Sequence, residues 1–181
     1  MCAIEVTPVV STERLILRGP VRTDAIALAH LLNDVNVAGM TSQIPHPYGM
    51  ADAEAWLDRA MKCGFQHDAD FVIEHRNFGV VGGLSFDPAD KSKGERSELG
   101  YWIGRPYWNR GYATEAVRGA MKWAKRDWRR NVVVAGHFAD NPASGQVLCK
   151  AGFLYTGDVE RRTSLARGRA DVPTRMMVWL A

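Results

Sequence analysis

A low cysteine count, the absence of long apolar runs and a nearly balanced charge set the first limits on this chain. Its three cysteines, Cys2, Cys63 and Cys149, are far apart and share no paired ligand spacing, so they predict neither a disulfide framework nor a zinc site. No segment approaches the roughly 18 apolar residues of a membrane helix, and the first residues lack the basic and apolar pattern of a signal peptide. We therefore expect a cytoplasmic protein with no membrane partner and no bound metal.

The charge balance gives no reason to expect a nucleic acid partner. Lys and Arg number 23 against 20 acidic residues, a formal net charge of +3, which is too small to indicate nucleic acid binding. A chain of 181 residues, 46% of them hydrophobic, fits one globular domain, and no repeat, low-complexity tract or linker divides it. We expect a single domain over residues 1–181, with residues 1–12 as a loose lead-in.

The hydrophobic patterns predict a mixed α/β (α+β) fold with a central sheet of about seven strands and about four helices. The expected strands lie at 15–18, 71–74, 80–86, 98–103, 132–138, 153–163 and 175–180. The expected helices lie near 24–33, at 52–63, from 111–114 to beyond Ala124, and from 142 to 151. Because a long helix separates strands 98–103 and 132–138, these two strands should be parallel. The last two strands should form a hairpin.

A strand-to-helix turn at 107–117 is the most informative stretch. Gly111 and Ala113 are small, so backbone amides there can approach a bulky anion, and an apolar helical stripe starts immediately afterwards. The N–H groups of a helix N-terminus have no intrahelical partner and favour phosphate. Taken alone, the stretch favours an ordinary turn with one useful glycine over a phosphate site, because short turns that contain glycine are common.

A second helix has clear start and stop residues. Asn141 is suited to the N-cap and Pro142 to the first helical position, while Gly152 ends the helix. Ser144 falls in the first turn of this helix.

Three motifs, in this order and spacing, resemble the GNAT acetyltransferases, and within them the branch similar to the enzymes that acetylate the N-terminal amine of ribosomal proteins. The motifs are Glu98–Ile103, Tyr107–Ala116, and Asn141–Ser144 followed by Lys150–Phe153. The resemblance extends from Glu13 to the last strand. It implies one GNAT domain with a splayed parallel strand pair, acetyl-CoA as cosubstrate, and direct attack of a primary amine on the thioester in a ternary complex.

The resemblance also implies the residues that bind acetyl-CoA. The pyrophosphate should lie on the turn, and the pantetheine arm should lie beside the backbone of the fourth expected strand and the start of the last helix. The implied cofactor-binding residues are Trp102, Ile103, Arg110, Gly111, Tyr112, Ala113, Thr114, Asn141 and Ser144. The family's leading Arg or Gln is Trp108 here, and a frequent Gly is Asn109, so side-chain contacts from these two positions are not expected.

Glu98 and Ser144 are the implied catalytic residues. Glu98 can take the proton of the amine directly or through water, or it is a carboxylate of the strand surface with no such part. A backbone N–H near Ile103 is the candidate oxyanion donor. Many relatives have a Tyr where this chain has Leu148, so Ser144 is the candidate for the leaving group, unless it only helps to cap its helix. His137 is a further candidate base, although a single His on a strand is usually structural.

The acceptor is the open question. We expect a protein or peptide N-terminal amine; an aminoglycoside or polyamine is the alternative, for which an acidic pocket would be expected, and the loop at 34–50 supplies only Asp34. A non-catalytic acyl-CoA sensor is the third hypothesis, which the presence of both Glu98 and Ser144 disfavours. Five arginines near the last hairpin, Arg161, Arg162, Arg167, Arg169 and Arg175, are either solvated or attract an acidic group. The protein is expected to be a monomer or a homodimer.

Overall fold

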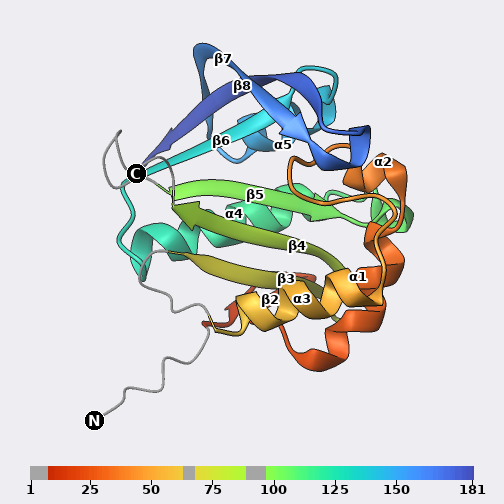
Figure 1. The fold of residues 1–181 in the computed structure, drawn as a ribbon. Coiled ribbons are helices and arrows are strands. Elements are labelled where there is room, and N and C mark those ends of the chain that lie inside the picture. Colours follow the sequence, from red (N-terminus) through yellow and green to blue (C-terminus); the bar gives the residue numbers. More distant parts are fainter. Residues whose placement is uncertain (1–7, 63–67, 89–96) are drawn as a thin grey trace.

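The fold is a twisted eight-stranded mixed sheet with helices on both faces (Figure 1). A computed structural model describes residues 8–62, 68–88 and 97–181. The strands lie side by side in the order β1-β2-β3-β4-β5-β6-β8-β7. The strands β1 to β5 form one half of the sheet in chain order, and β6, β8 and β7 form the other half.

The first half of the sheet is antiparallel throughout. It consists of β1 (Val10–Ser11), β2 (Leu15–Arg18), β3 (Ala69–His75), β4 (Gly79–Pro88) and β5 (Ser97–Ile103). β2 alternates between buried and half-buried positions, whereas β3 and β4 contain continuous buried runs at 71–73 and 81–84, as strands covered on both faces do.

The second half begins with β6 (Val132–Phe138), which is parallel to β5. The helix α4 (Tyr112–Arg126) makes the connection between the two strands, and it is followed later by α5 (Pro142–Lys150). The chain ends with the hairpin of β7 (Leu154–Ser164) and β8 (Ala170–Leu180), in which β8 also pairs with β6. The expected parallel pair and the expected final hairpin are both confirmed.

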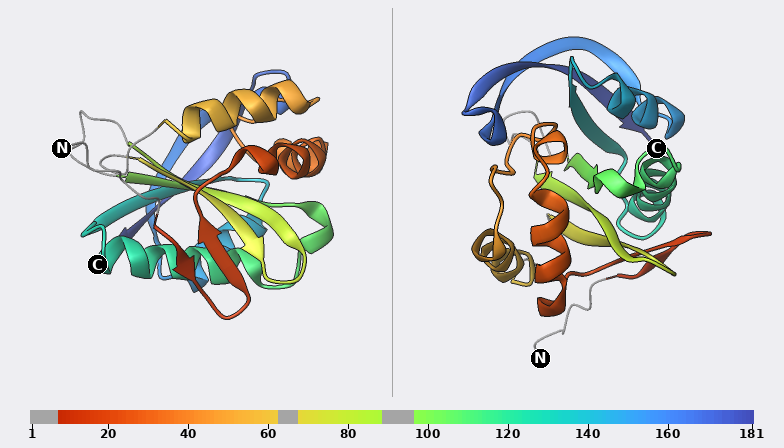
Figure 2. Two further views of the ribbon diagram at one scale, coloured as in Figure 1. Left: turned by 90° about the horizontal axis from the view of Figure 1, so that it is seen from below. Right: turned by 90° about the vertical axis from the view of Figure 1, so that its right-hand side faces the viewer.

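The helices divide between the two faces of the sheet (Figure 2). The helices α1 (Ala25–Leu32) and α3 (Met50–Ala60) cover one face, and the four-residue α2 (Val35–Ala38) follows α1. The helices α4 and α5 cover the other face, where most of the large buried side chains gather in the main core. A smaller core lies under α1 and α3.

The strand β5 sends its side chains alternately to these two cores. Leu99 and Ile103 belong to the main core, and Tyr101 packs against it, whereas Trp102 packs against the smaller one. Glu98 lies on the same face as Trp102, because side chains two or four positions apart point to the same side of a strand. This alternation separates the hydroxyl of Tyr101 from the carboxylate of Glu98 by the thickness of the sheet.

The expected fold class is confirmed, with two additions. The strand β1 lies within the expected lead-in at 1–12 and pairs with β2, which makes eight strands in the described residues instead of about seven. The helix α2 lies in the segment at 34–50 that was expected to be irregular. The helix expected at 52–63 starts two residues earlier and extends to Ala60, while Cys63 lies outside the described residues.

No helix among residues 8–62, 68–88 and 97–181 is long and apolar enough to cross a membrane. The same ranges contain no group of three or more His, Cys, Asp or Glu side chains arranged to hold a metal ion.

Candidate active site

The centre of the sheet opens between β5 and β6. The two strands pair only at three positions, where Ser97, Glu98 and Leu99 face Val133, Val134 and Ala135. Beyond Leu99, β5 continues to Ile103 with β4 as its partner, and beyond Ala135, β6 continues to Phe138 with β8 as its partner. The strands therefore diverge, and within the described residues no strand fills the space between their ends.

The backbone of β5 directs hydrogen-bond donors into this divergence. The N–H of Gly104 donates to the carbonyl of Val81 on the β4 side at 2.8 Å. Because N–H groups alternate in direction along a strand, the N–H groups of Tyr101 and Ile103 point the other way, toward β6. The sequence alone could not show where the N–H of Ile103 points. In the structure it points into the divergence of β5 and β6.

The turn before α4 has an exposed helix N-terminus at its end. Asn109 and Gly111 have positive φ values of 60° and 80°, which turn the chain sharply before the helix starts at Tyr112. No side chain within the described part of the protein caps this helix. The N–H groups of Tyr112, Ala113 and Thr114 therefore lack both an intrahelical and a side-chain partner, which is the arrangement that binds phosphate.

Trp108 has a structural role in the same turn. Its indole Nε1–H donates to the carbonyl of Ile103 at 2.6 Å, although 40% of the residue is exposed. This bond ties the turn to the end of β5. A Trp at the position where relatives have Arg or Gln thus fixes the distance between the two parts of the expected cofactor site.

Arg14 stands beside this helix terminus, and the sequence reasoning did not single it out. Its guanidinium donates to Glu115 at 2.7 Å and to the carbonyl of Arg110 at 3.1 Å, and it lies 4.7 Å above the ring of Tyr112. A cation is unfavourable at a helix N-terminus unless an anion accompanies it, and Glu115 supplies that anion. The Arg14 side chain is 41% exposed, so solvent reaches its charge beside the start of α4.

The start of α5 carries the second half of the site. The side-chain oxygen of Asn141 accepts a hydrogen bond from the N–H of Ser144 at 3.2 Å, as the expected N-cap requires. The Ser144 hydroxyl lies 2.8 Å from the phenolic oxygen of Tyr101, which also lies 3.1 Å from the Ser144 carbonyl. Burial raises the pKa of Tyr101 well above its ordinary value, so the phenol stays protonated.

Tyr101 was missed because its contact crosses from β5 to α5. Its ring belongs to a strand pattern that reads as simple core alternation. The residue one turn after Ser144, Leu148, is fully buried in the main core and offers no hydroxyl. A pattern read along one helix cannot reveal a phenol supplied by a different strand.

Glu98 is bonded to a guanidinium. Both of its carboxylate oxygens accept from Arg162 of β7, and the same guanidinium donates to Glu160 at 2.9 Å. Burial lowers the pKa of Arg162, but the bonds to Glu98 and then to Glu160 outweigh it, so the pKa is raised overall. Glu98 is thus held by a residue 64 positions away in the chain.

Two further carboxylates share the Glu98 face of the sheet. Asp87 of β4 is the direct cross-strand neighbour of Glu98 and accepts from the Ser85 hydroxyl at 3.1 Å. Asp70 of β3 pairs with Ser85. Burial, followed by the charge of Asp87, raises the pKa of Asp70 to about 6, and burial also raises the pKa of Asp87. By sequence, only Asp34 in the segment at 34–50 can contribute to an acidic pocket. The fold instead brings Asp70, Asp87 and Glu98 together on one face of the sheet.

Arg167 connects three segments at the far end of the site. Its guanidinium donates to Asp140 at 2.6 Å and to the carbonyl of Gly39 at 2.6 Å, and it lies 5.1 Å above the ring of Phe138. These partners come from the loop before α5, from the end of α2 and from the end of β6. Nearby, the Ser164 hydroxyl donates to the carbonyl of Thr41 at 3.0 Å.

The arginines near the last hairpin are therefore largely engaged. Arg161 pairs with Asp171, Arg162 with Glu98 and Glu160, and Arg167 with Asp140. These three side chains serve internal ion pairs and are not simply solvated.

His137 has a partner on each ring nitrogen. Nδ1 lies 2.9 Å from the carbonyl of Phe138, so it is the protonated nitrogen, and Nε2 then accepts from the Tyr155 hydroxyl at 3.0 Å. The ring is buried. This arrangement is typical of a structural histidine.

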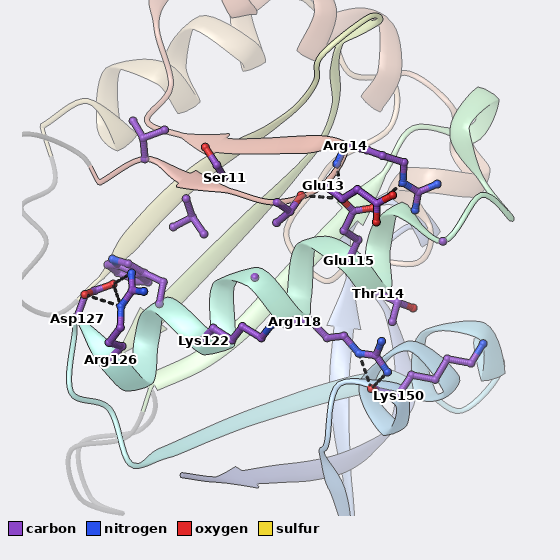
Figure 3. A pocket seen from close by; sticks show the side chains of 16 residues that line it. Ser11, Glu13, Arg14, Thr114, Glu115, Arg118, Lys122, Arg126, Asp127 and Lys150 are labelled. Atoms are coloured by element: carbon purple, nitrogen blue, oxygen red, sulfur yellow. Dashed lines mark hydrogen bonds and ion pairs between the residues drawn. The ribbon is translucent and has the colours of Figure 1, made fainter.

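A groove of about 740 Å³ runs along the outer side of α4 from its N-terminus (Figure 3). Thr114, Arg118 and Lys122 line it at intervals of four residues, and the segment from Val9 to Arg14, which includes β1, forms its opposite wall. Arg118 donates to the carbonyl of Lys150 at 2.6 Å, which links α4 to α5. The groove thus joins the exposed amides of α4 to a row of positive charges.

Comparison with known proteins identifies the family. Residues 14–154 match the model of the acetyltransferase (GNAT) domain, so the chain belongs to the GNAT acetyltransferases. It is an N-acetyltransferase with acetyl-CoA as its cosubstrate. The chain is similar to the uncharacterized N-acetyltransferase YoaA of Bacillus subtilis (strain 168), with 29% identity over 161 residues that cover 83% of this chain and 85% of the relative.

Solved structures share the whole fold at lower identity. The structure of RimL, a ribosomal L7/L12 alpha-N-protein acetyltransferase in complex with coenzyme A, superposes with a TM-score of 0.81 at 16% identity, covering 96% of this chain and 98% of that one. The spermidine N-acetyltransferase of Vibrio cholerae in complex with CoA and spermine gives a TM-score of 0.76 at 18% identity, covering 93% and 96%. These likenesses concern the fold and leave the acceptor undetermined.

Proposed function

We propose that this enzyme acetylates the N-terminal amine of a protein or peptide, with acetyl-CoA bound across the divergence of β5 and β6. The observation that carries the proposal is the position of the two functional groups relative to that divergence. Glu98 belongs to the middle one of the three residue pairs that join β5 to β6, and its side chain lies on one face of the sheet. Ser144 lies at the start of α5 on the other face. An acceptor can thus approach from the Glu98 side while the thioester is held from the Ser144 side.

The proposed cofactor site has two parts. The N–H groups of Tyr112, Ala113 and Thr114 hold the pyrophosphate, with Gly111 leaving room for it and Arg110 bordering it. The pantetheine arm then follows the backbone of Trp102 and Ile103 and reaches the amide of Asn141. The Ile103 N–H, which points toward β6, matches this path.

Three groups meet the chemical needs of acetyl transfer. Glu98 accepts the proton that the acceptor ammonium must lose before it attacks the thioester carbon. The Ile103 N–H donates to the thioester oxygen as negative charge develops there. Ser144 donates a hydrogen bond to the sulfur as the C–S bond breaks. None of these steps needs a group from outside the described residues.

The ion pair between Glu98 and Arg162 supports an acceptor with one positive charge. Arg162 pairs with both Glu98 and Glu160, so a guanidinium stands directly beside the carboxylate that would take the proton. A peptide N-terminus brings a single ammonium and a chain of neutral amides to this position. A polycation would meet the guanidinium of Arg162 as a like charge.

The test is free-thiol release from acetyl-CoA with a panel of amines: peptides with different first residues, polyamines and aminoglycosides. The proposal expects the highest kcat/KM with a peptide and loss of activity when its N-terminus is blocked. Turnover of polyamines alone would overturn the peptide assignment. Binding of acetyl-CoA without turnover of any amine would instead favour a sensor.

A small cationic amine is the second candidate, and the carboxylates of Asp70 and Asp87 favour it. Both lie on the Glu98 face, where they can attract additional ammonium groups. The substitution Asp87→Asn separates the two candidates because it removes one of these charges without touching Glu98. It should raise KM for a polyamine severalfold and leave KM for a peptide nearly unchanged.

A further inference from the structure

The hydroxyl of Tyr101 contacts the hydroxyl of Ser144, and this contact would serve a purpose in acetyl transfer. The phenolic oxygen lies 2.8 Å from the Ser144 hydroxyl oxygen, and it reaches the first turn of α5 from the neighbouring strand β5. We infer that Tyr101 is a positioning residue that aims the Ser144 O–H at the sulfur of the cofactor. This inference rests on the proposed function, in particular on the role of Ser144.

The hydroxyl hydrogens of Tyr101 and Ser144 can be arranged in two ways, and only one of them leaves a hydrogen for the cofactor. The pair has two donor hydrogens, one on each hydroxyl, and the Ser144 carbonyl lies within reach of Tyr101 at 3.1 Å. In one arrangement Tyr101 donates to that carbonyl and Ser144 donates to Tyr101, so both hydrogens are used internally. In the other arrangement Tyr101 donates to the Ser144 hydroxyl oxygen, and the hydrogen of Ser144 is free for a third group.

The two arrangements differ only in the rotation of two hydroxyl hydrogens, so a change between them needs no movement of the backbone or the ring. Without a cofactor, the first arrangement satisfies every hydrogen of the pair. With a sulfur beside Ser144, the second arrangement adds a hydrogen bond to that sulfur. Since Ser144 then accepts one bond while it donates another, its O–H becomes a stronger donor.

The surroundings hold both partners in place. The Asn141 side chain fixes the backbone of Ser144, and the Tyr101 ring packs against the main core. The raised pKa of Tyr101 keeps its hydrogen in place over the working range of pH. Without the phenol, the Ser144 side chain would be free to take other rotamers.

A binding experiment tests the inference without any acceptor. Dissociation constants for CoA and for desulfo-CoA, which lacks the sulfur, are measured above the ordinary thiol pKa of about 8.5. The wild-type protein should bind CoA more tightly than desulfo-CoA. The substitutions Tyr101→Phe and Ser144→Ala should each reduce this preference by the loss of one hydrogen bond, about 2- to 12-fold.

Tyr155→Phe is the matched control. Tyr155 also carries a hydroxyl close to α5, but it donates to His137 instead of Ser144. This variant should keep the wild-type preference for CoA. If Tyr101→Phe keeps it as well, the inference is wrong.

A double-mutant cycle on kcat is the second measurement. With Ser144 present, Tyr101→Phe should lower kcat about 2- to 12-fold with little change in KM for acetyl-CoA. In the Ser144→Ala background it should have no further effect, because there is no hydroxyl left to aim. An equal loss in both backgrounds would mean that Tyr101 acts only through the scaffold, and it would overturn the inference.

The two measurements also separate this inference from the proposed function. If the wild-type enzyme transfers acetyl to no amine, the proposed function fails, while the preference for CoA over desulfo-CoA still decides the role of Tyr101. If acetyl transfer proceeds and Tyr101→Phe changes neither kcat nor that preference, the function stands and the inference fails.

Discussion

The glycine at the start of α4 permits a quantitative test of the cofactor site. Gly111 has φ of 80°, and a Cβ added there would lie 3.4 Å from the Arg14 guanidinium. Alanine in this left-handed conformation costs about 1–2 kcal/mol. In a domain of this size, such a cost lowers Tm by roughly 2–8 °C.

The same substitution should weaken cofactor binding. We expect relief of the strain to rotate the turn and to move the amides of Tyr112 to Thr114 away from the proposed pyrophosphate position. The loss of one hydrogen bond to a charged group, about 1.5–3 kcal/mol, raises Kd for CoA roughly tenfold to 150-fold. Isothermal titration with CoA measures the affinity, and thermal unfolding without ligand measures the stability.

Gly157→Ala is the control for backbone strain. Gly157 also has a positive φ, 90°, and a Cβ added there would meet nothing within 4 Å. It lies on β7 and not in the turn. It should lower Tm by a comparable amount and leave Kd for CoA unchanged. The reasoning is refuted if Gly111→Ala loses stability but binds CoA with wild-type affinity.

Three further substitutions probe the other side of the divergence. Burial raises the pKa of Asp70 to about 6 from its ordinary value of 3.8, so ionisation destabilises the fold as pH rises between these values. Asp70→Asn should therefore gain up to about 3 kcal/mol of stability over wild type above pH 6 and nothing below pH 4, as thermal unfolding at each pH will show. Glu98→Gln should lower kcat and change the pH profile of kcat/KM, and an unaltered rate and profile would remove Glu98 from catalysis. Arg167→Lys loses the bonds that join Asp140 to Gly39, so KM for the amine should rise severalfold with little change in KM for acetyl-CoA; an increase in the latter alone would contradict this arrangement.

The sequence predicted the elements whose signals are local. The cap formed by Asn141 and the turn at Gly111 depend on residues within a short stretch, the parallel pair around α4 follows from the long helix between its strands, and the structure has all three. The family resemblance then assembled them into one site.

Contacts between distant elements could not be predicted in this way. The bond between Tyr101 and Ser144 joins residues 43 positions apart, and the pair of Glu98 with Arg162 spans 64 positions. Arg162 and Arg167 look solvated in the sequence because two of their partners, Glu98 and Asp140, lie outside the hairpin. Propensity and periodicity describe the conformation of a segment, whereas these pairs depend on which segments the fold brings together.

The three-pair ladder between β5 and β6 has a consequence for the order in which the substrates bind. It makes this seam the least hydrogen-bonded junction between neighbouring long strands of the described sheet, so the two halves of the protein have their greatest freedom of relative movement there. A cofactor that contacts Ile103 on one side and Asn141 on the other bridges both halves and restricts that movement. In the proposed site the amine meets Glu98 of one half and Arg162 of the other, which an ion pair already joins, and the cofactor adds further links across the same seam. Acetyl-CoA is therefore expected to bind first and the amine second.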